Sequence, residues 1–133
     1  MLKIGAQSLI KQYVNGWEEN NLEKILGCLS KDCLIIESHG PIYRGKDSVK
    51  NWFAYWLKGK GKVLKWNIKD IYFLKNQNIA FFEWYFACVV EGKKHVLPGI
   101  SIVKFKNSKI SFIHEYRMTK NAYDWKEDKL MSD

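Results

Sequence analysis

One acidic side chain lies in a setting that would change its chemistry. Glu37 is part of CLIIESH at 33–39, a mostly apolar stretch. Burial in such a stretch would raise the pKa of its carboxyl toward neutrality. A carboxylate with a pKa near neutrality suits a general base. The alternative interpretation is a carboxylate at the rim of the protein or in a structural salt bridge.

A second acid and an arginine lie two residues apart on a predicted strand. Glu115 and Arg117 share one face of that strand because side chains alternate along it, and they are close enough to pair. Arg117 is one of only two arginines in the chain. Two interpretations stay open: a polar anchor for an oxygen-rich ligand, or an internal ion pair, which would be weak evidence for stability.

The histidines do not predict a metal site. His39 borders a turn at Gly40 and Pro41, and His114 alternates onto the outer face of its strand. One histidine per face does not supply convergent ligands, so no metal is expected. No cofactor is expected either, because GKGK at 59–62 follows a helix and does not join a strand to a helix as a phosphate loop does.

The elements that must position these residues follow from the spacing of apolar side chains. Helical spacing at 4–17 includes Tyr13, and a second short helix at 22–29 has Asn21 as its cap. A first strand at 33–39 and a third helix bearing Val49, Trp52 and Trp56 come next. Four long strands at 63–74, 78–91, 94–105 and 109–118 are then joined by short polar turns.

The strand at 78–91 is rich in aromatic residues, and its two faces predict different roles. Phe82, Trp84, Phe86 and Cys88 share one face, which with Trp52 and Trp56 would wall a pocket or fill it. Phe81, Glu83 and Tyr85 share the other face, and Phe112, His114 and Tyr116 also alternate outward. An aromatic outer face predicts a homodimer.

Length and composition predict one domain at 1–119 followed by a tail or flap at 120–133. The formal charge of +8 comes from scattered lysines, which predicts a solvated surface and no nucleic-acid partner. Weak nucleic-acid binding would appear as strong salt dependence.

No segment resembles a signal peptide or membrane span. Three cysteines without paired spacing indicate a reducing compartment, so a cytoplasmic location is expected.

Two segments carry a resemblance to a known superfamily. IKQYVNGWEENNLEKILGCLSKDCLIIESHG at 10–40 resembles the opening helix pair and first strand of ketosteroid isomerases, and YRGKDSVKNWF at 43–53 resembles the glycine and helix that follow. The chain is therefore identified as a member of the superfamily of SnoaL-like polyketide cyclases, ketosteroid isomerases and nuclear transport factor 2. The resemblance implies an α+β cone, in which three N-terminal helices pack in the concavity of a strongly curved, mainly antiparallel sheet.

The same resemblance implies roles for particular residues. Tyr13 falls on the tyrosine that donates to the substrate oxyanion, although core packing is the competing interpretation, and Glu37 falls on the proton-shuttling carboxylate. Ser101 replaces a protonated aspartic acid, which would weaken the oxyanion hole and argues against steroid isomerisation. Pocket-facing positions of the last strand fall on Ile113, Glu115 and Arg117. If Arg117 paired with Glu37 inside the cavity, its positive charge would lower the pKa of the Glu37 carboxyl.

These assignments imply a function. The chain is expected to bind a partly apolar organic molecule in the cone and to act on it by acid/base chemistry, as an isomerase, cyclase, dehydratase or hydrolase. Glu37, Tyr13 and Ser101 are the expected catalytic residues. The expected ligand-binding residues are Glu115, Arg117, Trp52, Trp56, Trp84, Phe86, Ile113 and His39. A non-catalytic ligand carrier or dimeric adaptor is the alternative. Members of the superfamily commonly dimerise through the outer sheet face, as predicted here.

Overall fold

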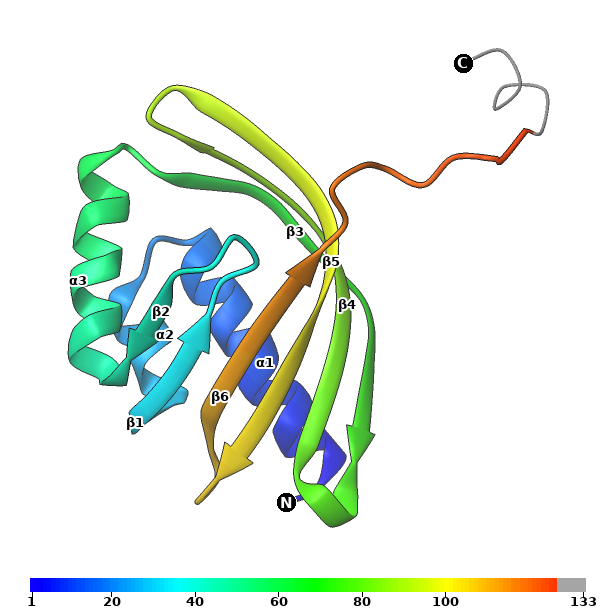
Figure 1. The fold of residues 1–133 in the computed structure, drawn as a ribbon. Helices are drawn as coiled ribbons and strands as arrows, with labels where there is room; N and C mark the ends of the chain where they lie inside the picture. Colours follow the sequence, from blue (N-terminus) through cyan, green and yellow to red (C-terminus); the bar gives the residue numbers. More distant parts are fainter. Residues whose placement is uncertain (127–133) are drawn as a thin grey trace.

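The structure is a computed structural model that describes residues 1–126 of the chain. Three helices and a six-stranded sheet make up the described part, with the strands in the order β2-β1-β6-β5-β4-β3 (Figure 1). The helices are α1 (Lys3–Glu18), α2 (Leu22–Gly27) and α3 (Gly45–Lys58). The strands are β1 (Leu29–Ile36), β2 (Ile42–Arg44), β3 (Lys62–Leu74), β4 (Ile79–Val90), β5 (Lys93–Lys106) and β6 (Lys109–Arg117), and a 3₁₀ turn, η1 (Lys75–Gln77), joins β3 to β4.

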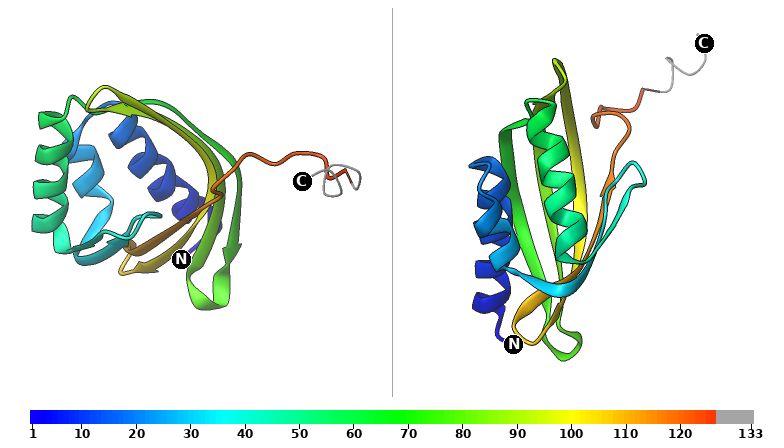
Figure 2. Two further views of the ribbon diagram at one scale, coloured as in Figure 1. Left: turned by 45° about the horizontal axis from the view of Figure 1, so that its top comes forward. Right: turned by 90° about the vertical axis from the view of Figure 1, so that its left-hand side faces the viewer.

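The sheet is mixed and curved. Strands β3 to β6 form an antiparallel meander, whereas β1 runs parallel to β6 and antiparallel to β2. The sheet bends around the helices, which lie on its concave side (Figure 2). Both β3 and β4 are long, and twist accumulates along long strands. The predicted α+β cone with three helices in the concavity of a curved sheet is confirmed.

The inner face of β4 is aromatic, as its alternation predicts. Phe82 and Trp84 are buried, and across the strand pair they face Ser101 and Gly99 of β5. Gly99 has to be glycine because a Cβ atom there would overlap the ring of Trp84. Because of this register, the indole ring of Trp84 packs directly against the backbone of Gly99 in the concave wall.

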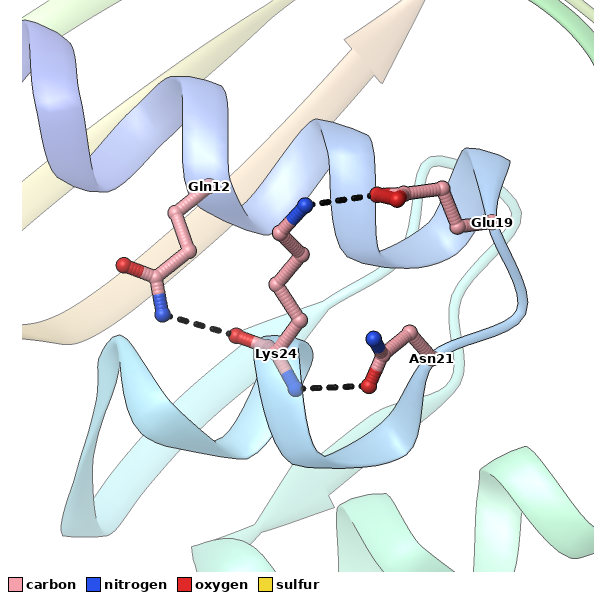
Figure 3. Close-up of polar contacts among 4 residues, drawn as sticks. All are labelled: Gln12, Glu19, Asn21 and Lys24. Carbon is pink, nitrogen blue, oxygen red and sulfur yellow. Dashed lines mark hydrogen bonds and ion pairs between the residues drawn. The ribbon is translucent and has the colours of Figure 1, made fainter.

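The first two helices meet at the turn that the sequence predicts. Asn21 Oδ1 accepts a hydrogen bond from the backbone N–H of Lys24 at 3.1 Å, which caps α2 (Figure 3). Gln12 Nε2 donates to the carbonyl oxygen of Lys24 at 3.0 Å, and Lys24 Nζ pairs with Glu19 at 2.7 Å. The contacts of Gln12 and Glu19 with Lys24 join α1 to α2.

The elements between the second and third helices differ from the prediction, since the second helix ends at Gly27 and not at Leu29. The first strand begins at Leu29, which pairs with Ile110 of β6, and ends at Ile36, which pairs with Ile42 of β2 and with His114 of β6. Glu37 therefore sits just past the strand. The short strand β2 was not predicted, since three residues after a Gly-Pro turn carry too little pattern to be recognised.

The predicted tail at 120–133 is described only in part. Residues 120–126 are exposed and run away from the sheet (Figure 2), and the rest of the tail lies outside the described residues. Within residues 1–126, no helix has both the length and the hydropathy needed to cross a membrane.

Candidate functional site

A cavity of about 500 Å³ lies between the helices and the concave face of the sheet. Of the predicted site residues, those that border it are Tyr13, Glu37, His39, Trp52, Trp56, Trp84, Phe86, Glu115 and Arg117. The aromatic rings therefore wall a space and do not fill it, which was one of the two interpretations of their spacing. A space of this size is enough for a small organic molecule.

Glu37 is fixed at the mouth of the cone by the turn that follows β1. Its backbone N–H donates to the carbonyl oxygen of Pro41 at 2.9 Å, and its side chain is 21% exposed. Tyr43 OH donates to its Oε1 at 2.6 Å, and His39 Nε2 lies 4.0 Å from the same oxygen. Burial raises the pKa of the Glu37 carboxyl, and the hydrogen bond from Tyr43 and then the field of His39 oppose the rise.

Glu115 lies on β6 opposite Ser101 of β5 and borders the same cavity. Burial raises the pKa of its carboxyl to about 8, and the negative charge of Glu37 adds to the rise. At neutral pH Glu115 is therefore mainly a carboxylic acid, which can donate a hydrogen bond or a proton. Two acids in one site can take opposite roles when their environments differ.

Glu115 and Arg117 do not form the ion pair that was one interpretation of their spacing. Both border the cavity, but Arg117 is exposed and no ion pair joins the two within residues 1–126. Glu115 is half-buried beside the cavity, whereas Arg117 at the end of β6 is exposed. Nor does Arg117 lower the pKa of Glu37, which is raised.

Tyr13 projects from α1 into the wall of the cavity. It is 1% exposed, and its ring makes edge contacts with Trp17 and Trp66 at centroid distances of 6.4 and 6.1 Å. Burial raises the pKa of its hydroxyl well above 10, and the field of Glu115 adds to the rise. Tyr13 therefore stays a neutral phenol and a hydrogen-bond donor.

Two predicted site residues lie behind the wall of the cavity. Ser101 is completely buried, and its Oγ accepts a hydrogen bond from Trp84 Nε1 at 2.9 Å. Ile113 is 1% exposed and belongs to the core. Neither is among the residues that line the cavity. The resemblance places both residues in the pocket, but the hydroxyl of Ser101 is bound by Trp84 behind the wall and Ile113 packs in the core.

Several lining residues were not among the predicted site residues. Tyr43, Trp17 and Trp66 border the cavity, and so does His95 at its mouth. Trp66 Nε1 is buried without a hydrogen-bond partner within residues 1–126. Simple alternation along β3 could not have placed Trp66 reliably, because the strand has two register irregularities and its buried positions do not alternate throughout.

Trp56 is held in the wall by a polar clamp. Its Nε1 donates to Asn20 Oδ1 at 2.9 Å, and Asn20 Nδ2 donates to the carbonyl oxygen of Gly61 at 3.0 Å. A Cβ atom on Gly61 would overlap the indole of Trp56. The end of α1, the face of α3 and the start of β3 thus fix one ring together.

The arrangement offers a proton acceptor, a proton donor and an apolar wall. Glu37 would accept a proton, Glu115 and Tyr13 would donate, and the rings would orient an organic molecule between them. Within residues 1–126, no group of three or more His, Cys, Asp or Glu side chains is placed to hold a metal ion.

Solved structures with the same fold come from several bacteria. An epoxide hydrolase of Mycobacterium tuberculosis described as LEH-like superposes with a TM-score of 0.75 at 11% identity, over 86% of this chain and 84% of that one. A protein from Xanthomonas campestris proposed to be a polyketide cyclase gives a TM-score of 0.70 at 13% identity, over 98% and 96%. A protein with a ketosteroid isomerase-like fold from Catenulispora acidiphila, in complex with trimethylamine, gives 0.68 at 12% identity, over 81% and 83%.

These identities are low, so the structures establish the fold alone. None of the curated proteins compared with the sequence matches it. The family model described as SnoaL-like domain matches residues 10–113, which run from α1 into β6 and include Tyr13, Glu37 and the aromatic wall. The chain belongs to the family of SnoaL-like domains.

Proposed function

We propose that this protein is an acid/base enzyme that acts on a partly apolar organic molecule, with Glu37 as the proton-transfer residue. The observation that carries the proposal is the pair Glu37 and Glu115 in one aromatic-walled cavity. Their environments separate their roles: Glu37 receives a hydrogen bond that favours its ionised form, whereas Glu115 holds a proton up to a pKa of about 8.

The reaction that fits this pair begins at a carbon atom next to a carbonyl group. The Glu37 carboxylate removes a proton from that carbon, and the electron pair of the broken C–H bond moves onto the carbonyl oxygen. Glu115 and Tyr13 donate hydrogen bonds to the negative oxygen as it forms. Return of the proton from Glu37 to a different carbon gives an isomer. Attack of the enolate carbon on a second carbonyl group of the same molecule gives a ring, and the oxygen of that carbonyl takes up the proton that Glu37 removed.

The remaining site residues have supporting roles in this proposal. Arg117, with His39 at the mouth, would orient a polar end of the substrate. Trp52, Trp56, Trp84 and Phe86 would contact its apolar part. Ser101 would act through Trp84, because its hydroxyl accepts the indole N–H and does not reach the cavity. No metal or cofactor takes part in the proposed steps.

The test is proton exchange at carbon, which does not require the product to be known. Small apolar ketones and enones are incubated with the protein in D₂O, and loss of the C–H signal is followed by NMR. Glu37→Gln keeps the size of the side chain and removes the base, so exchange should fall by about 10²- to 10⁴-fold while binding persists. Glu83→Gln, on the exposed outer face, is the matched control and should leave exchange unchanged.

The alternative is a carrier in which the same residues form a static polar network. A carrier would bind such molecules without exchange, and Glu37→Gln would alter only affinity. The similar structures named an epoxide hydrolase and a proposed polyketide cyclase favour the enzyme over the carrier, since both names describe chemistry on small organic molecules.

We further propose a homodimer through the outer sheet face, a cytoplasmic location and a single domain at 1–119. Exposed apolar residues on the sheet, among them Tyr72, Ile100 and Tyr116, support the dimer. The three cysteines are free and buried, which supports a reducing compartment. The scattered lysines support neither nucleic-acid nor membrane partners.

A further inference from the structure

The charge of the cavity is opposite to that of the chain. The sequence has 22 lysines and arginines against 14 acids, yet within residues 1–126 Arg117 is the one basic residue of those two types that borders the cavity. The glutamates that border it are Glu37, Glu91 and Glu115. A basic protein that keeps lysine away from its cavity and places Glu37 and Glu91 there has a local preference for positive charge, to which Glu115 adds no charge while it holds its proton.

The aromatic wall has the same preference. Trp66, Trp84 and Phe86 are set nearly at right angles to one another, with interplanar angles of 84°, 82° and 74° and centroids 5.1 to 6.4 Å apart. All three rings border the cavity, so a molecule bound there contacts aromatic carbon from more than one side. The face of an aromatic ring carries partial negative charge and attracts a cation within about 6 Å of its centroid.

We propose that the ligand of this cavity is a small organic cation that bears a tertiary or quaternary ammonium group. The inference rests on the proposed function, because it names the class of molecule that the same site accepts. The carbon substituents of such a cation match the apolar walls, and its positive charge is attracted by the carboxylate of Glu37 and by the aromatic rings. A compact primary ammonium is a poorer fit, because it is strongly hydrated and needs several acceptors, and one oxygen of Glu37 is already bound by Tyr43.

Anions and uncharged molecules fit the same walls less well. An anion would face the carboxylate of Glu37 and the negative faces of the rings, and the guanidinium of Arg117 is exposed at the end of β6. An uncharged molecule would gain nothing from the acidic residues beyond hydrogen bonds. Only a cation uses both features of the cavity.

The test compares two molecules of the same shape and different charge. Choline and its uncharged carbon analogue 3,3-dimethylbutan-1-ol are titrated into the full-length protein by isothermal calorimetry. Choline should bind at least about tenfold more tightly, which is the size expected when a cation meets several desolvated ring faces. Equal or tighter binding of the uncharged analogue would overturn the inference, and so would binding of neither molecule.

A variant tests whether the rings supply the preference. Phe86→Leu removes a ring face and keeps an apolar side chain, so the ratio of the two affinities should fall by about fivefold. Leu97→Met, on the residue paired with Phe86 across β4 and β5, should leave the ratio unchanged. Because both ligands are measured on each variant, a general loss of folded protein would weaken both and leave the ratio as it was. An unchanged ratio in Phe86→Leu contradicts a cation held by the wall.

The two proposals fail in different ways. If the uncharged analogue binds as well as choline, the ammonium class is wrong while the cavity remains a site for small molecules. The exchange assay in D₂O with uncharged ketones then decides the acid/base proposal independently.

Discussion

Tyr43 OH donates to Glu37 Oε1 at 2.6 Å while the ring of Tyr43 lies flat on Trp52, with centroids 4.0 Å apart and planes inclined by 4°. The short strand β2 supplies the tyrosine and α3 supplies the ring beneath it. The stack leaves the phenol with little freedom to turn, so the hydrogen bond holds the carboxylate in one orientation. Glu37 is thus positioned by elements that come after it in the chain.

Tyr43→Phe should raise the pKa of Glu37, because the hydrogen bond from Tyr43 lowers it. Phenylalanine keeps the stack on Trp52, so the change removes the donor and little else. The ionisation of Glu37 should move to higher pH in carboxyl carbon NMR, and the acid limb of a kcat/KM profile should move with it. Tyr55→Phe, which changes an exposed tyrosine at the same cavity, should move neither.

Glu115 should make the protein less stable as the pH rises. Its pKa is about 8 in the folded state against an ordinary 4.5, so between these values the folded state keeps a proton that the unfolded state has lost. The contribution of this proton to stability is complete below pH 4.5 and is lost as the pH rises through about 8. The size of the pKa shift predicts a loss of roughly a few kcal/mol in the free energy of unfolding.

Glu115→Gln provides the measurement. Urea unfolding at several pH values should give the same free energy for variant and parent near pH 4.5 and a more stable variant above pH 8, where glutamine has no charge to bury. Glu91→Gln, at an exposed residue of the same cavity, should follow the parent at every pH. A parent with flat stability between the two pH values would show that Glu115 is not held as a buried acid.

The sequence predicts the cone and much of its wall because both depend on local pattern. Alternation places Phe82, Trp84 and Phe86 on the inner face of β4, and helical spacing places Trp52 and Trp56 beside them. These positions depend only on the period of apolar residues along a helix or strand, which can be read from the sequence without knowing the neighbouring elements.

The sequence does not predict the role of a site residue when that role depends on which side chains pack over it. Ser101 faces inward as predicted, but Trp84 lies over it, and the indole N–H of Trp84 donates a hydrogen bond to the Ser101 hydroxyl oxygen. Glu115 and Arg117 share a strand face as predicted, but one lies within the cone and the other at its exit. Tyr43 reaches Glu37 only because β1 and β2 pair with Ile35 opposite Tyr43. Residue spacing predicts which face of a helix or strand a side chain lies on. The packing of other side chains on that face decides whether it reaches the cavity.

Ser101→Ala should destabilise the fold by about 1 to 3 kcal/mol, because it leaves the buried N–H of Trp84 without an acceptor. Thermal unfolding measures the loss. Ser111→Ala, whose exposed hydroxyl donates to the carbonyl oxygen of Lys104 at 3.1 Å, should cost much less. If Ser101→Ala abolished exchange at carbon while stability stayed unchanged, the serine would have a direct role in catalysis instead.

Ile100→Lys should dissociate the proposed homodimer. Ile100 of β5 is paired with Tyr116 of β6, and the two are 36% and 48% exposed on the outer face of the sheet. A charge introduced there would be buried on association, which is costly without a partner. Sedimentation equilibrium should show a dimer for the parent and a shift to monomer for the variant. Leu2→Lys, the same change at an exposed residue before α1, should keep the parent's state.

Gly61→Ala and Gly5→Ala should change stability in opposite directions. A Cβ on Gly61 would overlap the indole of Trp56, so that ring would have to leave its clamp with Asn20, at a cost of about 1 to 3 kcal/mol. A Cβ on Gly5 would meet only Met1 Cγ at 3.9 Å, and alanine in a helix is favoured over glycine by about 1 kcal/mol. Urea unfolding measures both. A displaced Trp56 should also weaken ligand binding in Gly61→Ala, whereas a variant that loses stability but binds as the parent does would place the ligand away from α3.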